Sequence, residues 1–290
     1  KYEVDSLCAQ LYLGYLYWKT TGIDRIFTKR YCEMIRVILH LFTTEQDHGK
    51  SSYFFQRDNC PDTDTLPNRG RGNAVRVAGM TWSGFRPSDD RCDYGYLIPS
   101  NMMAAKAMCF AAEIAREYYK SKELAAKCEA LAKEIQEGIR EYGITEHPEF
   151  GRIYAYETDG FGNYNLMDDA NSPSLLSMPY LGYCGREEPL YRNTRRFVLS
   201  DANPFYFKGN KAQGMGSPHT PEGYVWHIGI IMQALTSGSR QEILECLYML
   251  AGTHAGTNYM HESFDPSAPE KYSRPWFAWA NSLFAELLDK

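Results

Sequence analysis

The sequence lacks several features that would point directly to a class of function. Its eight cysteines are at least 17 residues apart, so there is no Cys-x-x-Cys pair of the kind that holds zinc. Neither sign of charge dominates, because 31 Lys and Arg face 36 Asp and Glu for a net charge of −5. With the two signs interleaved along the chain, we expect no nucleic-acid partner and no anionic membrane surface as partner.

Long apolar runs are also missing. The stretch from Leu11 to Trp18 is interrupted by Gly and Tyr, and it is far shorter than the roughly 20 residues that span a bilayer. We therefore expect a soluble chain with no membrane span. The first residue is Lys, and no basic-then-apolar leader precedes Asp5. This pattern indicates either a removed targeting segment or a piece of a longer protein, and it leaves the compartment open.

The common nucleotide and metal motifs are absent or incomplete. Gly70 and Gly72 begin a dinucleotide fingerprint, but Val75 stands where the third glycine belongs. His261-Glu262 lacks the second histidine of a zinc-protease helix, because Asp265 holds that place. Neither a phosphate-binding P-loop nor a Gly-x-Ser-x-Gly elbow occurs. We predict no cofactor and no metal site.

What the sequence does contain is helical periodicity over most of its 290 residues, at 44% hydrophobic composition. A short strand is expected near Ala74–Val77, and a loop or hairpin around Arg152–Tyr156. Caps, Gly stops and apolar stripes predict nine helices, at 5–21, 24–43, 101–119, 123–142, 172–183, 187–199, 221–236, 240–251 and 276–288.

The connections between these helices alternate between short and long. Such alternation is typical of antiparallel helix pairs whose long links emerge on one side. We therefore predict an all-α fold, an (α/α)6 barrel or toroid, with residues 1–290 forming a single domain. Twelve helices complete such a barrel, so about three are expected to precede Lys1. No fixed repeat occurs, which disfavours a solenoid.

The long connections carry side chains suited to binding sugars. Carboxylates and amides bind hydroxyl groups, and indole rings pack on the C–H faces of a pyranose. These side chains occur in 81–90, 168–171, 218–221, 261–265 and 274–277, and four of the five tryptophans lie in or beside the loops. This composition favours a carbohydrate cleft.

Two carboxyl groups are needed to hydrolyse a glycosidic bond, one as an acid and one as a base or nucleophile. Asp89 in the first long loop and Glu262 in the last are the natural pair. Each has a simpler interpretation, because Asp-Asp before a helix is often an N-cap and His-Glu is often a capping or surface pair.

A resemblance narrows these alternatives. The run Gly79–Asp90 (GMTWSGFRPSDD), continuing through Tyr94–Pro99, resembles the signature of the metal-independent exo-α-1,6-mannosidases of glycoside hydrolase family 125. Further similar blocks are KYEVDSL at the start, DDANSPSLLSMPYL, SPHTPEGYVWHI and HESF. The resemblance implies an (α/α)6 barrel and inverting, exo-acting hydrolysis of terminal non-reducing α-1,6-linked mannose. An N-terminal Trp-Leu-Arg-Asp block of that family has no counterpart here.

Roles for individual residues follow from the resemblance. It implies that Asp89 is the general acid, with adjacent Asp90 as the alternative, and that Glu262 is the general base. Inversion requires the two carboxyl groups to be roughly 6.5–9.5 Å apart. The predicted contacts to the terminal mannose are Trp82, Arg86, Asp90, Asn101, His219, His261 and Trp276.

The expected partner is a mannose-containing glycan, and the oligomeric state is open. Two other functions fit the same loops: a glycan-binding protein with little or no turnover, and an α/α-barrel exo-glycosidase with a different sugar specificity.

Overall fold

The computed structural model describes all residues from 1 to 290, and the chain divides into two compact units. Unit 1 comprises Lys1–Ile144 and Glu157–Asn165, and unit 2 comprises Thr145–Tyr156 and Leu166–Lys290. Each unit has its own helices and its own short strands. The single domain predicted over 1–290 stays a prediction.

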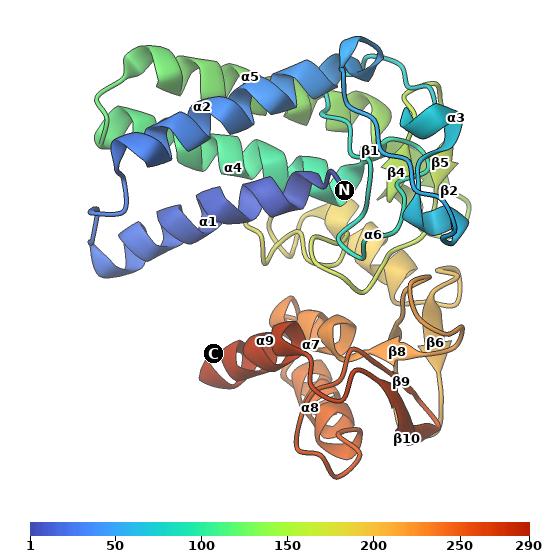
Figure 1. Ribbon diagram of the computed structural model, residues 1–290. Coiled ribbons are helices and arrows are strands. Elements are labelled where there is room, and N and C mark those ends of the chain that lie inside the picture. The colour runs from blue at the N-terminus through green and yellow to red at the C-terminus, as the bar shows by residue number, and fades with distance from the viewer. The chain divides into compact units, whose positions relative to one another are not determined.

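Unit 1 is built on four long helices that lie alongside one another (Figure 1). They are α1 (Val4–Thr21), α2 (Lys29–Thr44), α4 (Ile98–Glu117) and α5 (Lys122–Tyr142). Helix α4 packs against both α1 and α5 and is buried along most of its length. It contains many alanines, such as Ala104, Ala105 and Ala111, and their small side chains let neighbouring helices approach closely.

The ends of these helices follow local sequence signals. The Thr28 hydroxyl accepts a hydrogen bond from the amide of Tyr31 at 3.3 Å and caps α2, and Ser121 caps α5 in the same way. The prediction that a helix begins at Asp24 is wrong. Asp24 lies in a turn, where its carbonyl accepts from the Phe27 amide at 2.9 Å, and the hydroxyl cap is used four residues later.

The long connection from α2 to α4 gathers at the end of unit 1 where α1 and α4 begin (Figure 1). It contains the 3₁₀ turns η1 (Glu45–Lys50) and η2 (Asp62–Asp64) and the single turn α3 (Pro67–Gly70). A three-stranded antiparallel sheet of order β1-β4-β5 closes it, formed by β1 (Tyr96–Leu97), β4 (Glu157–Thr158) and β5 (Tyr164–Asn165).

The strand predicted near Ala74–Val77 does not form. That segment has no regular secondary structure, and a single backbone hydrogen bond, from the Arg76 amide to the Asp159 carbonyl at 2.9 Å, takes the place of the ladder that a strand would form.

Unit 2 contains four helices, with α7 packed against α8 and α9. They are α6 (Pro189–Val198), α7 (His227–Leu235), α8 (Arg240–Gly252) and α9 (Ala278–Asp289). The strands are β2 (Ile144–His147), β3 (Gly151–Tyr154), β6 (Tyr206–Lys208), β7 (Gln213–Met215), β8 (Val225–Trp226), β9 (Ser263–Asp265) and β10 (Ala268–Ser273). The β2–β3 pair is the hairpin expected around Arg152–Tyr156.

An antiparallel sheet of order β10-β9-β8 leads directly into α7 (Figure 1). Ser263 in β9 is paired with Ser273 on one side and with Trp226 on the other. This register fixes the backbone around Glu262, which immediately precedes β9.

Two predicted helices of unit 2 are wrong or too long. Residues 172–183 form turns instead of a helix. Pro173 and Pro179 lack amide donors, and the amides of Leu175 and Leu176 donate to the carboxylate of Asp168 at 2.8 and 3.0 Å. The helix predicted from residue 221 begins only at His227, because 221–224 form a turn and β8 follows.

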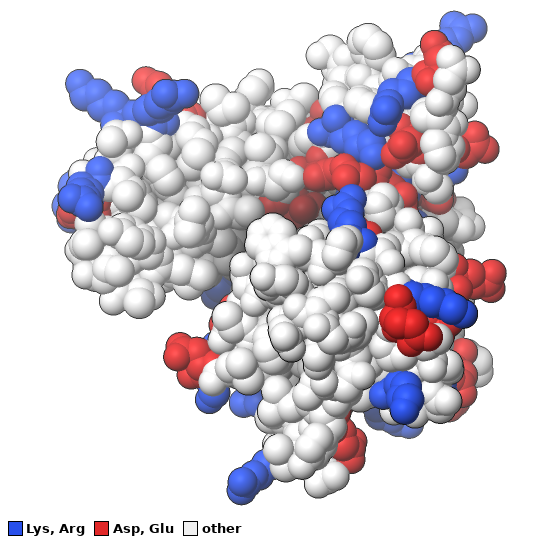
Figure 2. Space-filling view, turned by 60° about the horizontal axis from the view of Figure 1, so that its bottom comes forward, with Lys and Arg blue, Asp and Glu red and all other residues white.

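All eight cysteines are free in this structure. None of its helices combines the length and apolar character needed to cross a membrane. On the face shown in Figure 2, basic and acidic side chains occur in small groups among uncharged surface, in keeping with the interleaved charges of the sequence.

Candidate active site

The first predicted loop is attached to α4 by Asn101. The Asn101 side chain is buried, and its amide group donates to the carbonyls of Thr81 and Leu97, each at 3.0 Å. Its Oδ1 accepts from the Thr81 amide at 2.8 Å. These three bonds use the side chain to hold the loop, so its polar atoms are engaged with backbone groups of unit 1.

Trp82 is buried within a stack of rings. Its indole lies against the imidazole of His48, with centroids 3.5 Å apart and planes 6° from parallel, and Tyr2 stacks at 6.2 Å. The His48 ring is fixed by Glu45 Oε2 at 2.6 Å and by the carbonyl of Arg71 at 2.8 Å. No pattern in the sequence predicts this support, because Glu45 and His48 lie in a segment without periodicity.

Arg86 and Asp90 close a tight turn that presents Asp89. The Arg86 amide donates to the Asp90 carbonyl at 2.7 Å, and the Asp89 amide donates to the Arg86 carbonyl at 2.9 Å. The Arg86 guanidinium is buried and pairs with Glu157 at 2.6 Å. Asp89 adopts a φ of 69°, which is uncommon for a residue with a side chain. Its side chain is 65% exposed, whereas Asp90 is buried.

The start of the chain supplies charged neighbours of Asp89. Lys1 Nζ donates to the Asp89 carbonyl at 2.5 Å and lies 3.8 Å from its Oδ1. Burial, and after it the proximity of Asp89, raises the pKa of Glu3. The pKa of Asp5 is raised to about 7, chiefly by burial and then by the charge of Glu3. Both carboxyl groups belong to the KYEVDSL block, whose resemblance implies no role for them.

Glu262 lies in unit 2, immediately before β9. Its side chain is 6% exposed, and both carboxylate oxygens have partners. The Ser273 hydroxyl donates to Oε2 at 2.9 Å, and Arg274 Nε lies 3.1 Å from Oε1. Each carboxylate oxygen thus has one donor, and the two contacts fix the orientation of the carboxyl group, as a base that positions a water molecule requires. Sequence reasoning missed Ser273, because it predicts no strands between the helices at 240–251 and 276–288 and so gives no hairpin register.

His261 is fully buried, and its ring is engaged within unit 2. Its Nδ1 lies 2.8 Å from the Pro275 carbonyl, and the ring stacks on Tyr272 at 3.9 Å. The backbone amide of His261 donates to Nδ1 of His227 at 2.8 Å, so a neutral His227 donates through Nε2 to Thr253. Burial lowers the pKa of His227 to about 3, which keeps this ring neutral.

The two remaining predicted residues of unit 2 are exposed. Trp276 exposes 59% of its surface, and His219 is also exposed, with its ring 6.5 Å from that of buried Trp226. An exposed indole offers the flat apolar face on which a sugar ring packs.

The structure thus places Trp82, Arg86, Asp89, Asp90 and Asn101 together in one loop and helix of unit 1. It places His219, His261, Glu262 and Trp276 in unit 2, around β8 and β9. Exposed Asp89 and Trp276 contrast with the buried Trp82, Asn101 and His261, whose polar or aromatic groups are packed against the scaffold.

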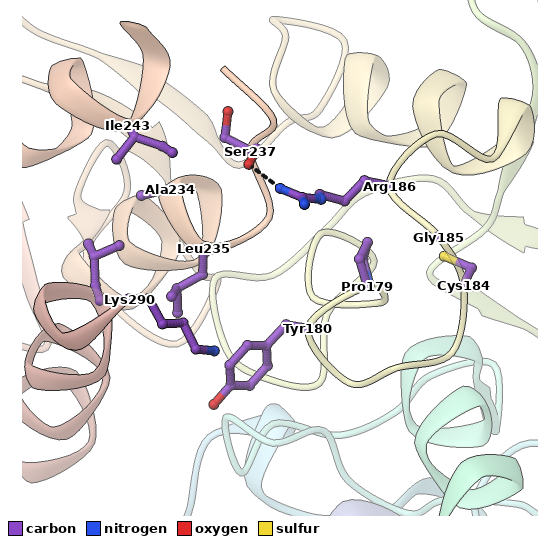
Figure 3. A pocket seen from close by; sticks show the side chains of 11 residues that line it. Pro179, Tyr180, Cys184, Gly185, Arg186, Ala234, Leu235, Ser237, Ile243 and Lys290 are labelled. Carbon is purple, nitrogen blue, oxygen red and sulfur yellow. Dashed lines mark hydrogen bonds between the residues drawn. The ribbon is translucent and has the colours of Figure 1, made fainter. Parts of the chain in front are cut away.

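No three His, Cys, Asp or Glu side chains gather in a way that could hold a metal ion. Unit 2 contains a cavity of about 690 Å³ between α7, α8, α9 and the turns after Pro179 (Figure 3). Arg186 reaches across it and donates to the Ser237 carbonyl at 2.7 Å. None of the predicted site residues lines this cavity.

Comparison with known proteins identifies relatives of the whole chain. The family model described as metal-independent alpha-mannosidase, glycoside hydrolase family 125, matches residues 1–288. The Meiotically up-regulated gene 157 protein of Schizosaccharomyces pombe is 41% identical over 99% of this chain and 58% of its own length. The chain therefore spans less than two thirds of that relative.

Two solved structures are similar. A metal-independent alpha-mannosidase of Streptococcus pneumoniae, solved as a non-productive complex with alpha-1,6-mannobiose, is 47% identical, with a TM-score of 0.98. The match covers 99% of this chain and 68% of that one. A bacterial glucoamylase matches 67% of this chain and 33% of its own at 16% identity, with a TM-score of 0.54, and shares the fold alone. Both are (α/α)6 barrels, which confirms the predicted fold class. The chain belongs to glycoside hydrolase family 125, the metal-independent alpha-mannosidases.

Proposed function

We propose that this protein hydrolyses terminal non-reducing α-1,6-linked mannose from oligosaccharides or N-glycans, with inversion and without a metal. Family membership supports the class of reaction, and the pneumococcal relative was solved with alpha-1,6-mannobiose, which supports the linkage. The chain spans 58% of its fungal relative, so the activity is proposed for the protein in its full length.

The observation that carries the assignment of roles is the contrast between two carboxyl groups. Glu262 is 6% exposed, and a guanidinium and a hydroxyl donor each contact one of its oxygens, so its carboxyl group is held in one orientation. Asp89 is 65% exposed at the tip of its turn, where a leaving group can reach it. A fixed group that orients water and an accessible group that meets the leaving oxygen are the two parts that the reaction needs.

The proposed reaction is a single displacement. Glu262 removes a proton from a water molecule whose oxygen attacks C1 of the terminal mannose. The bond from C1 to the bridging oxygen breaks, and Asp89 gives its proton to that oxygen, which leaves as O6 of the next sugar. Room for the water requires a separation of roughly 6.5–9.5 Å between the two carboxyl groups during the reaction.

Asp90 is the alternative acid. It is buried and directly follows Asp89 in the same turn. The exposed position of Asp89 at the tip of the turn favours access to a substrate instead. Asp89→Asn and Asp90→Asn, compared on a substrate with a good leaving group, separate the two: loss of the acid is largely compensated by such a leaving group, whereas structural damage is not.

Sugar binding is assigned first to Trp276 and His219, the exposed members of the predicted set. Trp82, Asn101 and His261 then act by holding the loops, since their contacts are within the scaffold. Arg86 joins them through its buried ion pair with Glu157.

The deciding experiment is proton NMR of α-1,6-mannobiose incubated with the full-length protein in the presence of a chelator. We expect β-mannose as the first product, and no product from Glu262→Gln. Initial release of α-mannose would contradict inversion. Binding measured by calorimetry with no release of mannose would instead support the alternative of a glycan-binding protein.

A further inference from the structure

The carboxylate of Glu262 is held by two consecutive residues at the end of β10. In the β9–β10 pair, Ser263 lies opposite Ser273, so Arg274 follows on the side of Glu262. The hydroxyls of Ser263 and Ser273 are 2.8 Å apart, and Ser273 Oγ donates onward to Glu262 Oε2 at 2.9 Å. Arg274 Nε lies 3.1 Å from Oε1. Ser273 thus contacts one carboxylate oxygen of Glu262, and Arg274 contacts the other.

The backbone at Arg274 is unusual. Its φ is 43°, in the left-handed region where glycine is favoured, and Pro275 follows. Beyond this turn, the carbonyl of Pro275 lies 2.8 Å from the ring Nδ1 of His261, the residue before Glu262. The segments 261–263 and 273–275 are therefore joined by the imidazole, the carboxylate and the paired serines. An arginine at a position whose backbone favours glycine indicates that the arginine side chain makes a contact that outweighs this backbone cost.

Other charged or titratable groups near Glu262 are directed elsewhere. The His261 ring stacks on Tyr272 and bonds to Pro275, and the His227 ring lies between the His261 backbone and Thr253. Arg274 is the cation paired with Glu262, and 59% of its side chain is exposed, so water reaches this edge of the site.

We propose that Ser273 and Arg274 are positioning residues that hold Glu262 as an oriented carboxylate for the attacking water. This inference rests on the proposed function. A carboxylate oxygen has two lone pairs, so one bond to each oxygen leaves an acceptor site free on both. Ser273 and Arg274 occupy one site each, and the remaining sites are available to the water that Glu262 deprotonates. The proton of that water passes to Glu262, and neither Ser273 nor Arg274 exchanges a proton in the step.

The test uses Arg274→Gly, Arg274→Lys and Ser273→Ala in the full-length protein, with kcat and KM for α-1,6-mannobiose measured against pH. Glycine suits the backbone at 274, which offsets part of the lost ion pair with Glu262, so Arg274→Gly is expected to stay folded, as its unfolding midpoint will show. Its kcat should fall about 10- to 100-fold, as expected for a charge-assisted contact that orients a base, with KM changed little.

The pH profile distinguishes this role from a structural one. Arg274→Gly takes a positive charge away from the base, so the acidic limb of kcat/KM should move to higher pH. Arg274→Lys keeps the charge and should keep the limb, and added guanidinium ion should partly restore kcat of Arg274→Gly. Ser273→Ala should lower kcat with a smaller displacement of the limb.

Two failures are distinguishable. Active wild-type protein, with kcat and the acidic limb unchanged in Arg274→Gly, would overturn the positioning role and leave the proposed function intact. Wild-type protein that binds but releases no mannose would overturn the proposed function and this inference together.

Discussion

The indole of Trp82 and the imidazole of His48 stack with their centroids 3.5 Å apart and their planes 6° from parallel. His48 in turn is fixed by Glu45, whose second oxygen accepts from the Ser51 hydroxyl at 2.5 Å. The backbone amide of Trp82 also donates to the Glu45 carbonyl at 3.0 Å. Glu45 thus positions the tryptophan of the first long loop both through the His48 ring and through the backbone.

His48→Ala should lower the free energy of unfolding by about 3 kcal/mol, because it removes a stacked ring and leaves the buried Glu45 carboxylate without its partner. Urea denaturation followed by tryptophan fluorescence measures this directly. The matched control is His40→Ala, an exposed histidine in α2, for which a change within about 0.5 kcal/mol is expected. Equal effects of the two substitutions would contradict the supporting role of His48.

The pKa of Asp5, raised to about 7 in the folded protein from 3.8, predicts a dependence of stability on pH. Between these values the folded state binds more protons than the unfolded state, so the free energy of unfolding falls as pH rises through this window. Asp5→Asn removes the ionisation. Relative to wild type, the free energy of unfolding of the variant should increase by about 2 kcal/mol from pH 4 to pH 8. This is less than the full effect of the pKa difference, because solvent reaches the half-buried side chain.

The check is a series of urea denaturation curves at several pH values, with Asp58→Asn, at an exposed aspartate of the same unit, as the control. A difference between Asp5→Asn and wild type that stays constant from pH 4 to pH 8 would argue against the raised pKa.

Much of the helical framework was predictable because it depends on local signals. The helix expected at 5–21 is α1 (Val4–Thr21), and the one expected at 123–142 is α5 (Lys122–Tyr142). Apolar periodicity, the Ser121 cap and the Gly22 stop all act within one or two turns of chain.

The errors arise where tertiary contacts override local preference. Apolar side chains at Leu175, Leu176 and Met178 suggest a helix, and all three are buried, yet their segment wraps around the carboxylate of Asp168. Burial as high as this raises the pKa of Asp168 to about 8 in spite of two backbone hydrogen bonds. No pattern of spacing in the sequence carries that information.

The candidate site was predictable as a set of loops but not as a set of contacts. Glu262 stood out as a carboxyl group next to a histidine in a long connection. Its partners Ser273 and Arg274 depend on the β9–β10 register, which a segment read as loop cannot provide. In the same way, the left-handed turn at Asp89 follows from bonds between Arg86 and Asp90.

Glu3→Gln should move the alkaline limb of kcat/KM to lower pH by up to about one unit, if Asp89 is the acid. Glu3 places a negative charge near Asp89, while Lys1, 3.8 Å from Asp89 Oδ1, opposes it. Removing the negative charge leaves the Lys1 ammonium as the dominant neighbouring charge, which accounts for the expected direction. Glu149→Gln, at an exposed site of unit 2, is the control. An alkaline limb that stays in place in Glu3→Gln would contradict the assignment of Asp89 as the acid.

Substitutions of Asn101 distinguish a direct contact with the sugar from a role in holding the loop. All three hydrogen bonds of its side chain go to the backbone of Thr81 and Leu97, so Asn101→Ala should lower the free energy of unfolding by about 3 kcal/mol. Asn101→Asp should cost at least as much, because a carboxylate oxygen would replace the donor that faces two carbonyls. Measurement of KM for mannobiose beside the denaturation curves separates the two roles. A direct sugar contact would raise KM and leave stability near that of wild type, whereas a loop anchor lowers stability first and affects kcat through the position of the loop that carries Asp89.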